Sequence, residues 1–458
     1  MDKHYHLIGI GGIGMSGIAH LLLKRGARVS GSDLKQSKVI RALEGMGARI
    51  FVGHEAQNIS GADMVVYSSA VKEDNPEVRE AKRLGIPLIK RAEALAKLMQ
   101  GKMVITVAGS HGKTTTTSLT SYLLLEAGLS PTVAIGGILK NINTNACLGE
   151  GEYFVAEADE SDGSFLSYHP KYSIITNIDR EHLDYYRDFE SELKAFKDFI
   201  NNTDTTGCVF YCADDPNLKT LMRNCKTKSI SFGMKENADI HPVNIELNGL
   251  TSDFDCVYKG KHIDRFHLAL GGEHNISNAL SVIALGLELG IDLSFIKRTL
   301  AGYKGAARRL EIKYKDADIT VIDDYAHHPT EIRATLTAAA KLNPKRLIAV
   351  FQPHRFTRTK LLLDEFACAF EAADQVIITD IYAASESPLE GVTGKSIFDK
   401  IKAKSPDKPG CFLEKDKIVR QLINELSPGD LIITLGAGDI VKLSDELAEE
   451  LTKKTHHI

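Results

Sequence analysis

Residues 104–115 of this chain read VITVAGSHGKTT. The apolar, β-branched run at 104–108 predicts a buried strand, and this run breaks into a glycine turn that ends in Lys-Thr-Thr. Apolar residues then recur at helical spacing, which predicts a helix over 118–126. A strand, a glycine turn, Lys-Thr and a helix in this order are typical of a phosphate-binding loop.

The residue types in this turn suit a bound nucleotide. Gly109 and Gly112 allow backbone N–H groups to converge on phosphate oxygens. Lys113 supplies a positive charge, and the hydroxyl of Thr114 is placed to bind Mg²⁺. The loop is shorter than the common G-x-x-x-x-G-K-T pattern, because Val107 stands where that pattern has its first glycine. The alternative is a glycine turn that merely connects a strand to a helix.

The bulk composition narrows the class of protein. A chain of 458 residues is too long for one ordinary domain, so roughly three domains are expected. The net charge of −4 and the lack of a basic run argue against a nucleic-acid partner. No apolar run reaches the roughly 18 residues that span a bilayer, and the first residues lack a secretory apolar segment. We therefore expect a cytoplasmic protein without membrane insertion, whose seven cysteines are free thiols rather than a zinc site.

A second glycine loop, G-x-G-x-x-G at residues 9–14, follows a very short apolar strand. A predicted helix over 16–24 and a strand from residue 28 lead to Asp33, about twenty residues after the loop. This order is the Rossmann fingerprint, in which glycines permit close approach of a pyrophosphate and the acid contacts a ribose hydroxyl. The candidates for a nucleoside diphosphate site are therefore Asp33 and the loop residues Gly11, Gly12, Ile13 and Gly14. Strands at 64–67 and 86–89 and a helix at 91–99 continue the alternation to a first expected boundary at residue 101.

An apolar strand predicted at 153–156 ends in Glu157, the first of four acidic residues that continue to Asp162. A strand that delivers a carboxylate beside a phosphate loop is a common way of holding Mg²⁺. We assign this role to Glu157 and interpret the other acids as part of a solvated loop. A further strand at 173–177 leads to His182, for which a structural role and a metal or phosphate role are both open.

From residue 240 to 270 the pattern changes to short alternating strands, with turn signals at 248–249 and 259–260. The next segment carries Asn275 and Asn278 and opens a predicted apolar helix over 279–289. Residues three apart share a helix face, and capping accounts for only one of the two asparagines. A compact basic segment at 305–311 marks the second expected boundary.

The last segment returns to alternating strands and helices, with strands predicted at 319–322, 346–351, 375–379 and 431–434. Polar clusters rich in histidine, arginine and aspartate follow the first two of these strands, at 323–329 and 352–359. Ligands bind at the carboxyl ends of strands in open α/β sheets. Of the adjacent residues His327 and His328, only one is expected to face such a site.

Together these segments resemble the Mur ligase family, and the resemblance covers the whole chain. The variant phosphate loop of this family matches residues 109–114, with Thr115 beside it. The family's magnesium glutamate matches Glu157, and its central-domain histidine matches His182. Its asparagine pair falls on Asn275 and Asn278. Its interdomain arginine falls on Arg309, and its C-terminal-domain aspartate falls on Asp324.

The resemblance implies an α/β fold of three domains. A Rossmann-like UDP-sugar domain is expected at 1–100, a central P-loop ATP-binding domain with a mixed sheet at 101–306, and a Rossmann-like amino-acid-binding domain at 307–458. Domain closure that excludes water is expected as well, because an acyl phosphate hydrolyses readily.

Within the family, the loop at 9–17 and the segment at 352–359 point to ATP-dependent ligation of L-alanine to the carboxylate of UDP-N-acetylmuramate. This reaction of peptidoglycan precursor synthesis passes through an acyl phosphate. The implied cofactors are ATP and two Mg²⁺ ions, with Mn²⁺ as a substitute, and a monomer or homodimer is expected.

The resemblance also assigns the site residues. The catalytic candidates are Lys113, Glu157, His182, Arg309 and Asp324. The ATP site adds Gly109, Ser110, His111, Gly112, Thr114, Thr115, Asn275 and Asn278, and the UDP-sugar site adds Ser69 and His111 to the first loop. The alanine site comprises Tyr325, His327, His354, Arg355 and Arg358.

Several family members carry a carbamylated lysine as a magnesium ligand, and that position falls on Phe196 in this chain. Neither Lys194 nor Lys197 takes its place in the alignment, so the full ligand set of the second ion stays open.

Other activities explain less of the chain. A related ligase re-attaches recycled murein tripeptide to UDP-N-acetylmuramate and shares the first loop, but the segment at 352–359 ranks it second. An NAD-dependent oxidoreductase accounts for Asp33 and the first loop only. A P-loop ATPase of another kind accounts for the middle segment only, and a nucleotide-binding module without chemistry leaves the C-terminal polar clusters unused.

Overall fold

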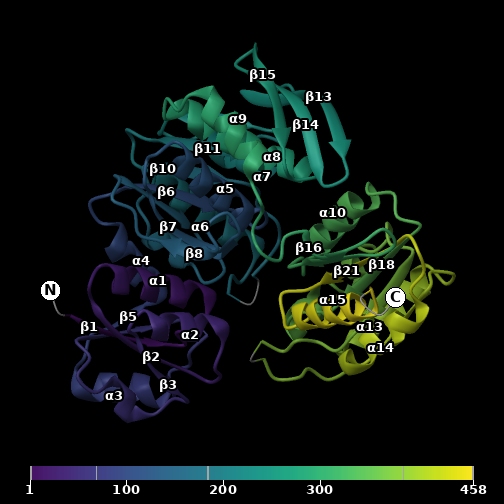
Figure 1. The fold of residues 1–458 in the computed structure, drawn as a ribbon. Coiled ribbons are helices and arrows are strands. Elements are labelled where there is room, and N and C mark those ends of the chain that lie inside the picture. The colour runs from purple at the N-terminus through teal and green to yellow at the C-terminus, as the bar shows by residue number, and fades with distance from the viewer. Residues whose placement is uncertain (1–2, 69, 183–184, 385, 456–458) are drawn as a thin grey trace. The chain divides into compact units, whose positions relative to one another are not determined.

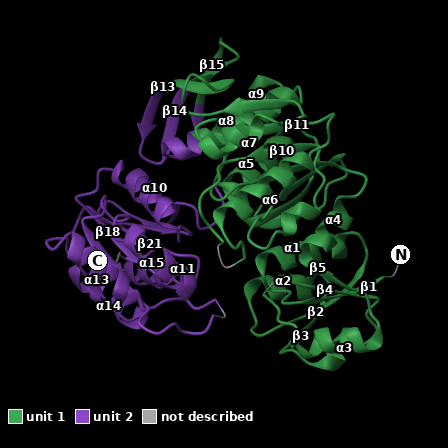
Figure 2. Cartoon of the chain, turned by 180° about the vertical axis from the view of Figure 1, so that it is seen from behind, with its two compact units in different colours: residues 1–243, 255–266, 277–304 green, residues 244–254, 267–276, 305–458 purple. Residues whose placement is uncertain are grey.

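The computed structural model describes residues 3–68, 70–182, 185–384 and 386–455. Ser69 therefore lies outside the described residues. The chain forms two compact units, coloured separately in Figure 2. Unit 1 comprises residues 1–243, 255–266 and 277–304, and unit 2 comprises residues 244–254, 267–276 and 305–458.

Unit 1 begins with a parallel five-stranded sheet of order β3-β2-β1-β4-β5. Its strands are β1 (His4–Ile8), β2 (Arg28–Asp33), β3 (Arg49–Val52), β4 (Met64–Tyr67) and β5 (Leu88–Lys90). The helices are α1 (Ile13–Lys24), α2 (Lys38–Gly45), α3 (Pro76–Leu84) and α4 (Arg91–Met99), with the short η1 (Ala56–Ile59). Figure 1 shows α1 and α4 on one side of this sheet and α3 on the other. The order reverses between β1 and β4, and such a switch point is where open α/β sheets bind ligands.

The second sheet has ten strands in the order β15-β14-β13-β12-β11-β10-β6-β9-β7-β8. Its strands are β6 (Met103–Ala108), β7 (Thr132–Leu139), β8 (Thr144–Cys147), β9 (Tyr153–Glu157), β10 (Tyr172–Ile175), β11 (Cys208–Cys212), β12 (Ser229–Phe232), β13 (Ile240–Asn248), β14 (Thr251–Tyr258) and β15 (Lys261–Leu268). Strand β6 pairs in parallel with both β9 and β10, so the carboxyl ends of these three strands meet at one edge. The pairing of β7 with β8 is antiparallel, which makes the sheet mixed.

The helices between β6 and the last sheet in the chain are α5 (Lys113–Glu126), α6 (Phe189–Asn201), α7 (Pro216–Met222), α8 (Glu273–Glu288) and α9 (Leu293–Gly302), with the short η2 (Ser164–Ser167). Helix α5 starts directly at the lysine of the phosphate loop. The predicted start at residue 118 was too late, because the threonines at 114–117 are buried against the protein and packing overrides their low helix propensity. Helix α8 likewise starts at Glu273, so both predicted asparagines lie inside its first turns.

Unit 2 contains a six-stranded sheet of order β16-β17-β21-β18-β19-β20. Its strands are β16 (Glu311–Lys315), β17 (Thr320–Asp324), β18 (Arg346–Phe351), β19 (Gln375–Ile378), β20 (Gly410–Phe412) and β21 (Asp430–Leu435). Its helices are α10 (Pro329–Ala340), α11 (Phe356–Leu361), α12 (Leu363–Phe366), α13 (Gly394–Lys404), α14 (Lys415–Glu425) and α15 (Val441–Thr455). The four predicted strands are confirmed, whereas the short edge strands β16 and β20 were missed.

Both faces of this sheet are buried. In β21, Leu431 and Ile433 join the cluster that contains Ile332 of α10, whereas Ile432 joins the cluster that contains Leu422 of α14. Successive strand residues point to opposite faces, which explains this division. The continuous apolar runs read from the sequence are thus strands covered by helices on both sides.

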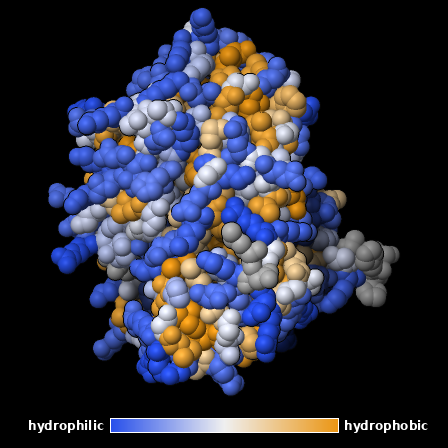
Figure 3. All heavy atoms as spheres, turned by 90° about the vertical axis from the view of Figure 1, so that its left-hand side faces the viewer, coloured by the Kyte–Doolittle hydropathy of each residue, from blue (hydrophilic) through white to orange (hydrophobic). Residues whose placement is uncertain are grey.

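Figure 3 shows one face of the protein, on which hydrophilic residues predominate and hydrophobic ones form scattered patches. Within the described part of the chain, no helix has the length and apolar character needed to cross a membrane.

Candidate functional site

The first glycine loop connects β1 to the start of α1. The backbone N–H of Gly11 donates to Oδ2 of Asp33 at 2.9 Å, so the acid at the end of β2 fastens the loop. Helix α1 begins at Ile13, and its first N–H groups therefore belong to the predicted loop residues. This arrangement places the N-terminus of α1 beside Asp33, and anion binding at this terminus stays a prediction.

Arg91, which the sequence analysis did not single out, lies beside this loop. Its Nη1 is 2.9 Å from the position that a Cβ atom on Gly14 would take, and its Nη2 is 3.5 Å from Oδ2 of Asp159. Burial opposes the charge of Arg91, but the negative charges around it, chiefly that of Asp159, together outweigh burial and raise the pKa of the guanidinium. One cation thus touches both the first loop and the acidic segment after β9.

The phosphate loop is closed by side chains from distant parts of unit 1. Gly112 has a φ of +82°, and a Cβ atom there would lie 2.7 Å from Oδ1 of Asn278, so glycine is required on both grounds. The N–H of His111 donates to Oδ1 of Asn177 at 2.9 Å, and Nε2 of His111 lies 3.0 Å from Oδ2 of Asp179. The loop is therefore held in shape by the strand ends that surround it.

Lys113 bends back over its own loop. Its Nζ donates to the carbonyl of Gly109 at 2.6 Å, to the carbonyl of Ser110 at 3.1 Å and to Oε1 of Glu160 at 2.8 Å. Burial opposes its charge, but Glu160 and Asp159 outweigh burial and raise the pKa of the ammonium group. The interpretation of Glu160 as a solvated-loop acid was wrong, because this side chain is completely buried and balances the charge of Lys113.

The side chains of Thr114, in the first turn of α5, and Glu157, at the end of β9, contact each other. The Thr114 hydroxyl donates to Oε1 of Glu157 at 3.1 Å, and the N–H of Gly136 donates to Oε2 at 3.0 Å. Burial raises the pKa of Glu157, although the charge of Lys113 acts in the opposite direction. A hydroxyl and a carboxylate side by side are the oxygen donors that Mg²⁺ prefers, so the residues present fit that ion.

His182 completes an acidic cluster on the other side of Lys113. Its Nε2 lies 3.2 Å from Oε1 of Glu160 and 3.3 Å from Oε2 of Glu181. Burial alone would lower the pKa of His182, but its hydrogen bonds to the two carboxylates outweigh burial and raise the pKa to about 10. The backbone of His182 is left-handed, with a φ of +54°, which costs energy in a residue other than glycine.

Two residues of α6, Glu192 and Phe196, are of interest near this cluster because one is acidic and the other stands at the position of the carbamylated lysine. Burial raises the pKa of Glu192 to about 8, with Glu160 and Glu181 adding to the rise and His182 opposing it. Phe196, at the aligned position of the carbamylated lysine, is completely buried, and its ring packs edge-on against Phe165 at 5.4 Å between centroids. Phe196 therefore belongs to the core and offers no ligand atom.

The two asparagines of α8 have different surroundings. The amide of Asn275 donates to the carbonyl of Gly271 at 2.8 Å, whereas the Asn278 side chain faces Gly112 of the phosphate loop. Both side chains are buried. Asn278 thus lies beside the phosphate loop, and its role in ATP binding stays a prediction, whereas the hydrogen bond from Asn275 to Gly271 lies within its own segment.

In unit 2, Asp324 ends β17 in a cradle of N–H groups. Its Oδ2 accepts from the N–H of Leu310 at 2.7 Å, and its Oδ1 accepts from the N–H of Ala326 at 2.8 Å. Burial nevertheless raises the pKa of Asp324 to about 6, although the charge of Arg309 acts against the rise. The guanidinium of Arg309 lies over the ring of Tyr325, 5.2 Å from its centroid.

Arg308 is a structural arginine that the sequence analysis did not single out. It donates through Nε to Oδ2 of the fully buried Asp323 at 2.9 Å, and through Nη2 to the carbonyl of Gly436 at 2.6 Å. These contacts tie the segment before β16 to the glycine turn after β21.

In the polar segment at 352–359 of unit 2, the ring of His354 packs against other aromatic rings. The ring of His354 lies 5.7 Å from His327 and is stacked on Tyr382, while Nη1 of Arg358 lies 3.2 Å from its Nδ1. Burial lowers the pKa of His354 to about 2, and His327 and Arg358 add to this effect. Arg355 adopts a left-handed backbone, with a φ of +71°, at the start of α11.

The adjacent histidines His327 and His328 have different surroundings. His328 is buried and caps α10, since its Nδ1 accepts from the N–H of Thr330 at 3.3 Å. The ring of His327 instead contacts Tyr325 and His354. The structure therefore gathers the predicted alanine-site residues His327, His354 and Arg358 in one place.

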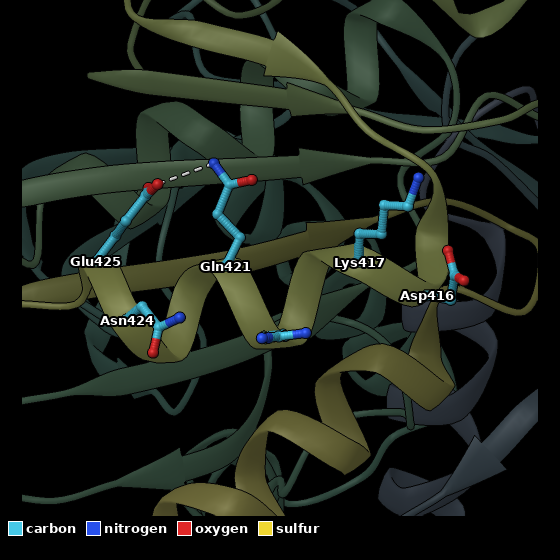
Figure 4. Close-up of a pocket in the computed structure, with 6 residues that line it drawn as sticks. Asp416, Lys417, Gln421, Asn424 and Glu425 are labelled. Carbon is cyan, nitrogen blue, oxygen red and sulfur yellow. Dashed lines mark hydrogen bonds between the residues drawn. The ribbon is translucent and has the colours of Figure 1, made fainter.

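A separate surface hollow of unit 2 runs along α14, and its lining side chains are shown in Figure 4: Asp416, Lys417, Arg420, Gln421, Asn424 and Glu425. All of them come from this one helix, and Gln421 donates to Glu425 at 2.9 Å. Side chains of a single exposed helix face do not converge on a ligand from several sides. We assign no site to this hollow.

Comparisons with known proteins cover nearly the whole chain. Residues 4–103 match the model described as Mur ligase family, catalytic domain; residues 107–286 match the Mur ligase middle domain; and residues 308–438 match the Mur ligase, glutamate ligase domain. A UDP-N-acetylmuramate–L-alanine ligase of Syntrophus aciditrophicus is 46% identical over 98% of this chain and 94% of its own length. A protein of the same name from Sulfurihydrogenibium is 47% identical over 99% and 98%.

Solved structures give the same result. The UDP-N-acetylmuramate-alanine ligase of Thermotoga maritima has a TM-score of 0.86 at 32% identity and covers 99% of this chain and 100% of its own. A murein peptide ligase of Psychrobacter arcticus has a TM-score of 0.75 at 25% identity and covers 98% of both chains. With its three α/β domains and its phosphate loop, this chain belongs to the Mur ligase family.

Proposed function

We propose that this protein is an ATP-dependent ligase that joins L-alanine to the carboxylate of UDP-N-acetylmuramate, a step of peptidoglycan precursor synthesis. The observation that carries the proposal is the constellation at the carboxyl ends of β6, β9 and β10, where Lys113, the Thr114–Glu157 pair and His182 surround one phosphate loop. The choice of substrates follows the names of the near-full-length relatives.

The reaction has two balanced steps. An oxygen of the muramate carboxylate attacks the γ-phosphorus of ATP, and the bond to the β,γ-bridging oxygen breaks to release ADP. The amine of L-alanine then attacks the acyl carbon of the resulting acyl phosphate, loses a proton and expels inorganic phosphate. The carboxylate in the first step and the amine in the second step each approach a negatively charged phosphate compound. Neutralising this negative charge is therefore the main task of the site.

The residues of the expected central ATP-binding domain divide this task. Lys113 leaves Glu160 to neutralise the transferred phosphoryl group, and the N–H groups of Gly109 to Gly112 hold the other phosphates. Ser110, His111, Thr115, Asn275 and Asn278 complete the ATP site in this proposal. Thr114, Glu157 and His182 would hold Mg²⁺, with Mn²⁺ as a substitute, and two bound ions would polarise the phosphoryl oxygens and offset their charge.

The other two substrates are assigned to separate groups. Gly11 to Gly14, Asp33, Ser69 and His111 take the UDP-sugar. Tyr325, His327, His354, Arg355 and Arg358 take L-alanine, because the planar donor forks of the arginines suit a carboxylate. Arg309 and Asp324 act on the nucleotide. We further place the domain boundaries near residues 100 and 306 and the reaction in the cytoplasm.

The experiment is a measurement of phosphate release from Mg·ATP with UDP-N-acetylmuramate, with L-alanine, glycine, L-serine or murein tripeptide added separately. Dependence on both UDP-N-acetylmuramate and L-alanine is the expected result. Preference for the tripeptide would overturn the choice of amino acid but keep the chemistry. Phosphate release that depends on none of these compounds would overturn the proposal.

A further inference from the structure

Tyr382 follows β19 and contacts two residues of the predicted alanine site in unit 2, although the proposed function gives it no role. Its backbone pairs with the segment that carries His354 and Arg355. The N–H of Tyr382 donates to the carbonyl of Pro353 at 2.8 Å, and the N–H of Arg355 donates to the carbonyl of Tyr382 at 2.9 Å. Residues 354 and 382 therefore form a parallel β-bridge outside the main strands.

This pairing supports a strained backbone at Arg355. Its φ of +71° lies in the left-handed region, which costs energy in a residue with a side chain, and the hydrogen bond to Tyr382 offsets part of that cost. Glu386, in the same connection between β19 and α13, holds the next turn. Its carboxylate accepts from the N–H of Thr357 at 3.1 Å and from the Thr357 hydroxyl at 2.6 Å. The connection after β19 thus fixes the backbone at residues 355 and 357, beside both arginines of the predicted alanine site.

The side chain of Tyr382 acts on the imidazole of His354. The two rings are stacked, with 5.7 Å between their centroids and 11° between their planes. The tyrosine ring also packs against the glycine turn after β21, because a Cβ atom on Gly438 would lie only 2.6 Å from Cγ of Tyr382. The ring is therefore held in place, and it holds the plane of the imidazole in turn.

The orientation of this imidazole decides which hydrogen bonds it makes. Nη1 of Arg358 lies 3.2 Å from Nδ1 of His354. A guanidinium group donates and never accepts, so Nδ1 is the acceptor and the proton of the neutral ring is on Nε2. Burial lowers the pKa of His354 to about 2, which keeps the ring neutral. A turn of the ring would break its contact with Arg358 and move the Nε2–H donor, and small displacements of this kind are costly in a binding site.

We propose that Tyr382 is a positioning residue of the amino-acid site. By stacking on His354 and pairing with the backbone beside it, Tyr382 holds this histidine and the neighbouring arginines in the arrangement that binds the carboxylate of the amino acid. Tyr382 acts through these residues and not by touching the substrate. The inference rests on the proposed function, from which it takes the amino-acid site, and it adds to that site a residue from the connection after β19.

The test is steady-state phosphate release by the full-length protein with Mg·ATP and UDP-N-acetylmuramate, in which the concentration of L-alanine is varied. Tyr382→Leu removes the flat ring, so the KM for L-alanine should rise at least ten-fold, while the KM for ATP stays within two-fold and kcat within three-fold of the wild type. Tyr382→Phe keeps the ring and should bring the KM for L-alanine back to within two-fold of the wild type. Leu389→Ala, which truncates an exposed side chain of the same connection, is the matched control and should behave like the wild type.

A merely structural role would have a different signature. Misfolded molecules do not turn over, so loss of fold lowers the apparent kcat and leaves the KM of the folded molecules unchanged. Tyr382 is 40% exposed, so the fold should tolerate these substitutions, and Tyr382→Met, with a flexible side chain, repeats the test should Tyr382→Leu fail to fold. An unchanged KM for L-alanine in Y382L, with or without a fall in kcat, would overturn the proposal. An equal rise of this KM in Y382F would overturn it as well, because stacking would then not be the cause.

Failure of this inference is distinguishable from failure of the proposed function. Wild-type turnover that depends on L-alanine, combined with an unchanged KM for L-alanine in Y382L, would reject the role of Tyr382 and leave the ligase activity standing. Wild-type phosphate release that responds to none of the added amino compounds would overturn the proposed function, and this inference with it.

Discussion

Nζ of Lys113 lies 2.8 Å from Oε1 of Glu160, a carboxylate that is completely buried in the same unit. The lysine of the phosphate loop is therefore already paired, and its side chain is only 13% exposed. In the proposed reaction, movement of this cation from Glu160 to a phosphate would exchange one ion pair for another, so little additional dehydration of the lysine would be needed.

Lys113→Ala should lower phosphate release by a factor of about 10³ or more, because the substitution removes the ammonium group that lies against the carbonyls of Gly109 and Ser110 in the loop. Binding of UDP-N-acetylmuramate should stay within a few-fold of the wild type. The two quantities are measured by a phosphate-release assay and by calorimetry. Lys197→Ala, on the exposed side of α6, serves as the control. Turnover that survives in K113A would show that the phosphate loop has been wrongly assigned.

Gly136→Ala should lower the affinity of the protein for Mg²⁺ without unfolding it. The added Cβ atom would lie 2.6 Å from Oε2 of Glu157, so the carboxylate must move away from Thr114. We expect the concentration of Mg²⁺ that gives half-maximal activity to rise about ten-fold. Gly45→Ala in α2 is the matched control, since its Cβ atom meets open space. An unchanged Mg²⁺ dependence in G136A would argue against Glu157 as a metal ligand.

Arg308→Ala should destabilise unit 2 rather than act on chemistry. The substitution leaves the buried carboxylate of Asp323 without its cation, and loss of one partner of a buried pair costs roughly 3–5 kcal/mol in free energy of unfolding. Urea unfolding followed by circular dichroism measures the loss. The exposed Arg420→Ala in α14 should change stability by less than about 0.5 kcal/mol. The double variant R308A/D323N should recover part of the loss, and a double variant as unstable as R308A would contradict the pairing.

Asp324 should give stability a distinct pH dependence. Its pKa is raised from 3.8 to about 6 in the folded protein, chiefly by burial, so the folded state holds this proton more tightly than the unfolded chain. The stabilising effect is present below about pH 4 and is lost as the pH rises through 6. Relative to Asp324→Asn, the wild type should lose about 3 kcal/mol between pH 4 and 7. Unfolding curves of both proteins across this range test the prediction, with the exposed Asp407→Asn as control. A difference that does not vary with pH would contradict it.

The sequence predicted the parts of the molecule that local patterns encode. The phosphate loop, the first glycine loop with Asp33 and the four inner strands of unit 2 all follow from periodicity and glycine placement over short windows. The hairpin strands β13 to β15 were also recognised, since their turns carry the Asn-Gly and Lys-Gly signals.

The sequence did not reveal partners that come together only in the folded chain. Glu160 lies 47 residues from Lys113, and Arg91 lies 68 residues from Asp159. An acid near a strand end looks the same in sequence whether it faces water or a buried lysine, so Glu160 was read as solvated. Glu192 did leave a signal, because it occupies an apolar position in the spacing of α6, and that irregularity was overlooked.

The contact between Asn278 and Gly112 also bears on how the protein is made. The phosphate loop appears early in the chain, but its wall includes Asn278 of α8, and the hydroxyl of Tyr303 meets Ser118 on the helix that follows the loop. A nascent chain on the ribosome therefore carries an incomplete nucleotide pocket until nearly 200 further residues have been synthesised, since Tyr303 and Ser118 are 185 residues apart. Chains released before that point would expose the loop without the ability to retain ATP.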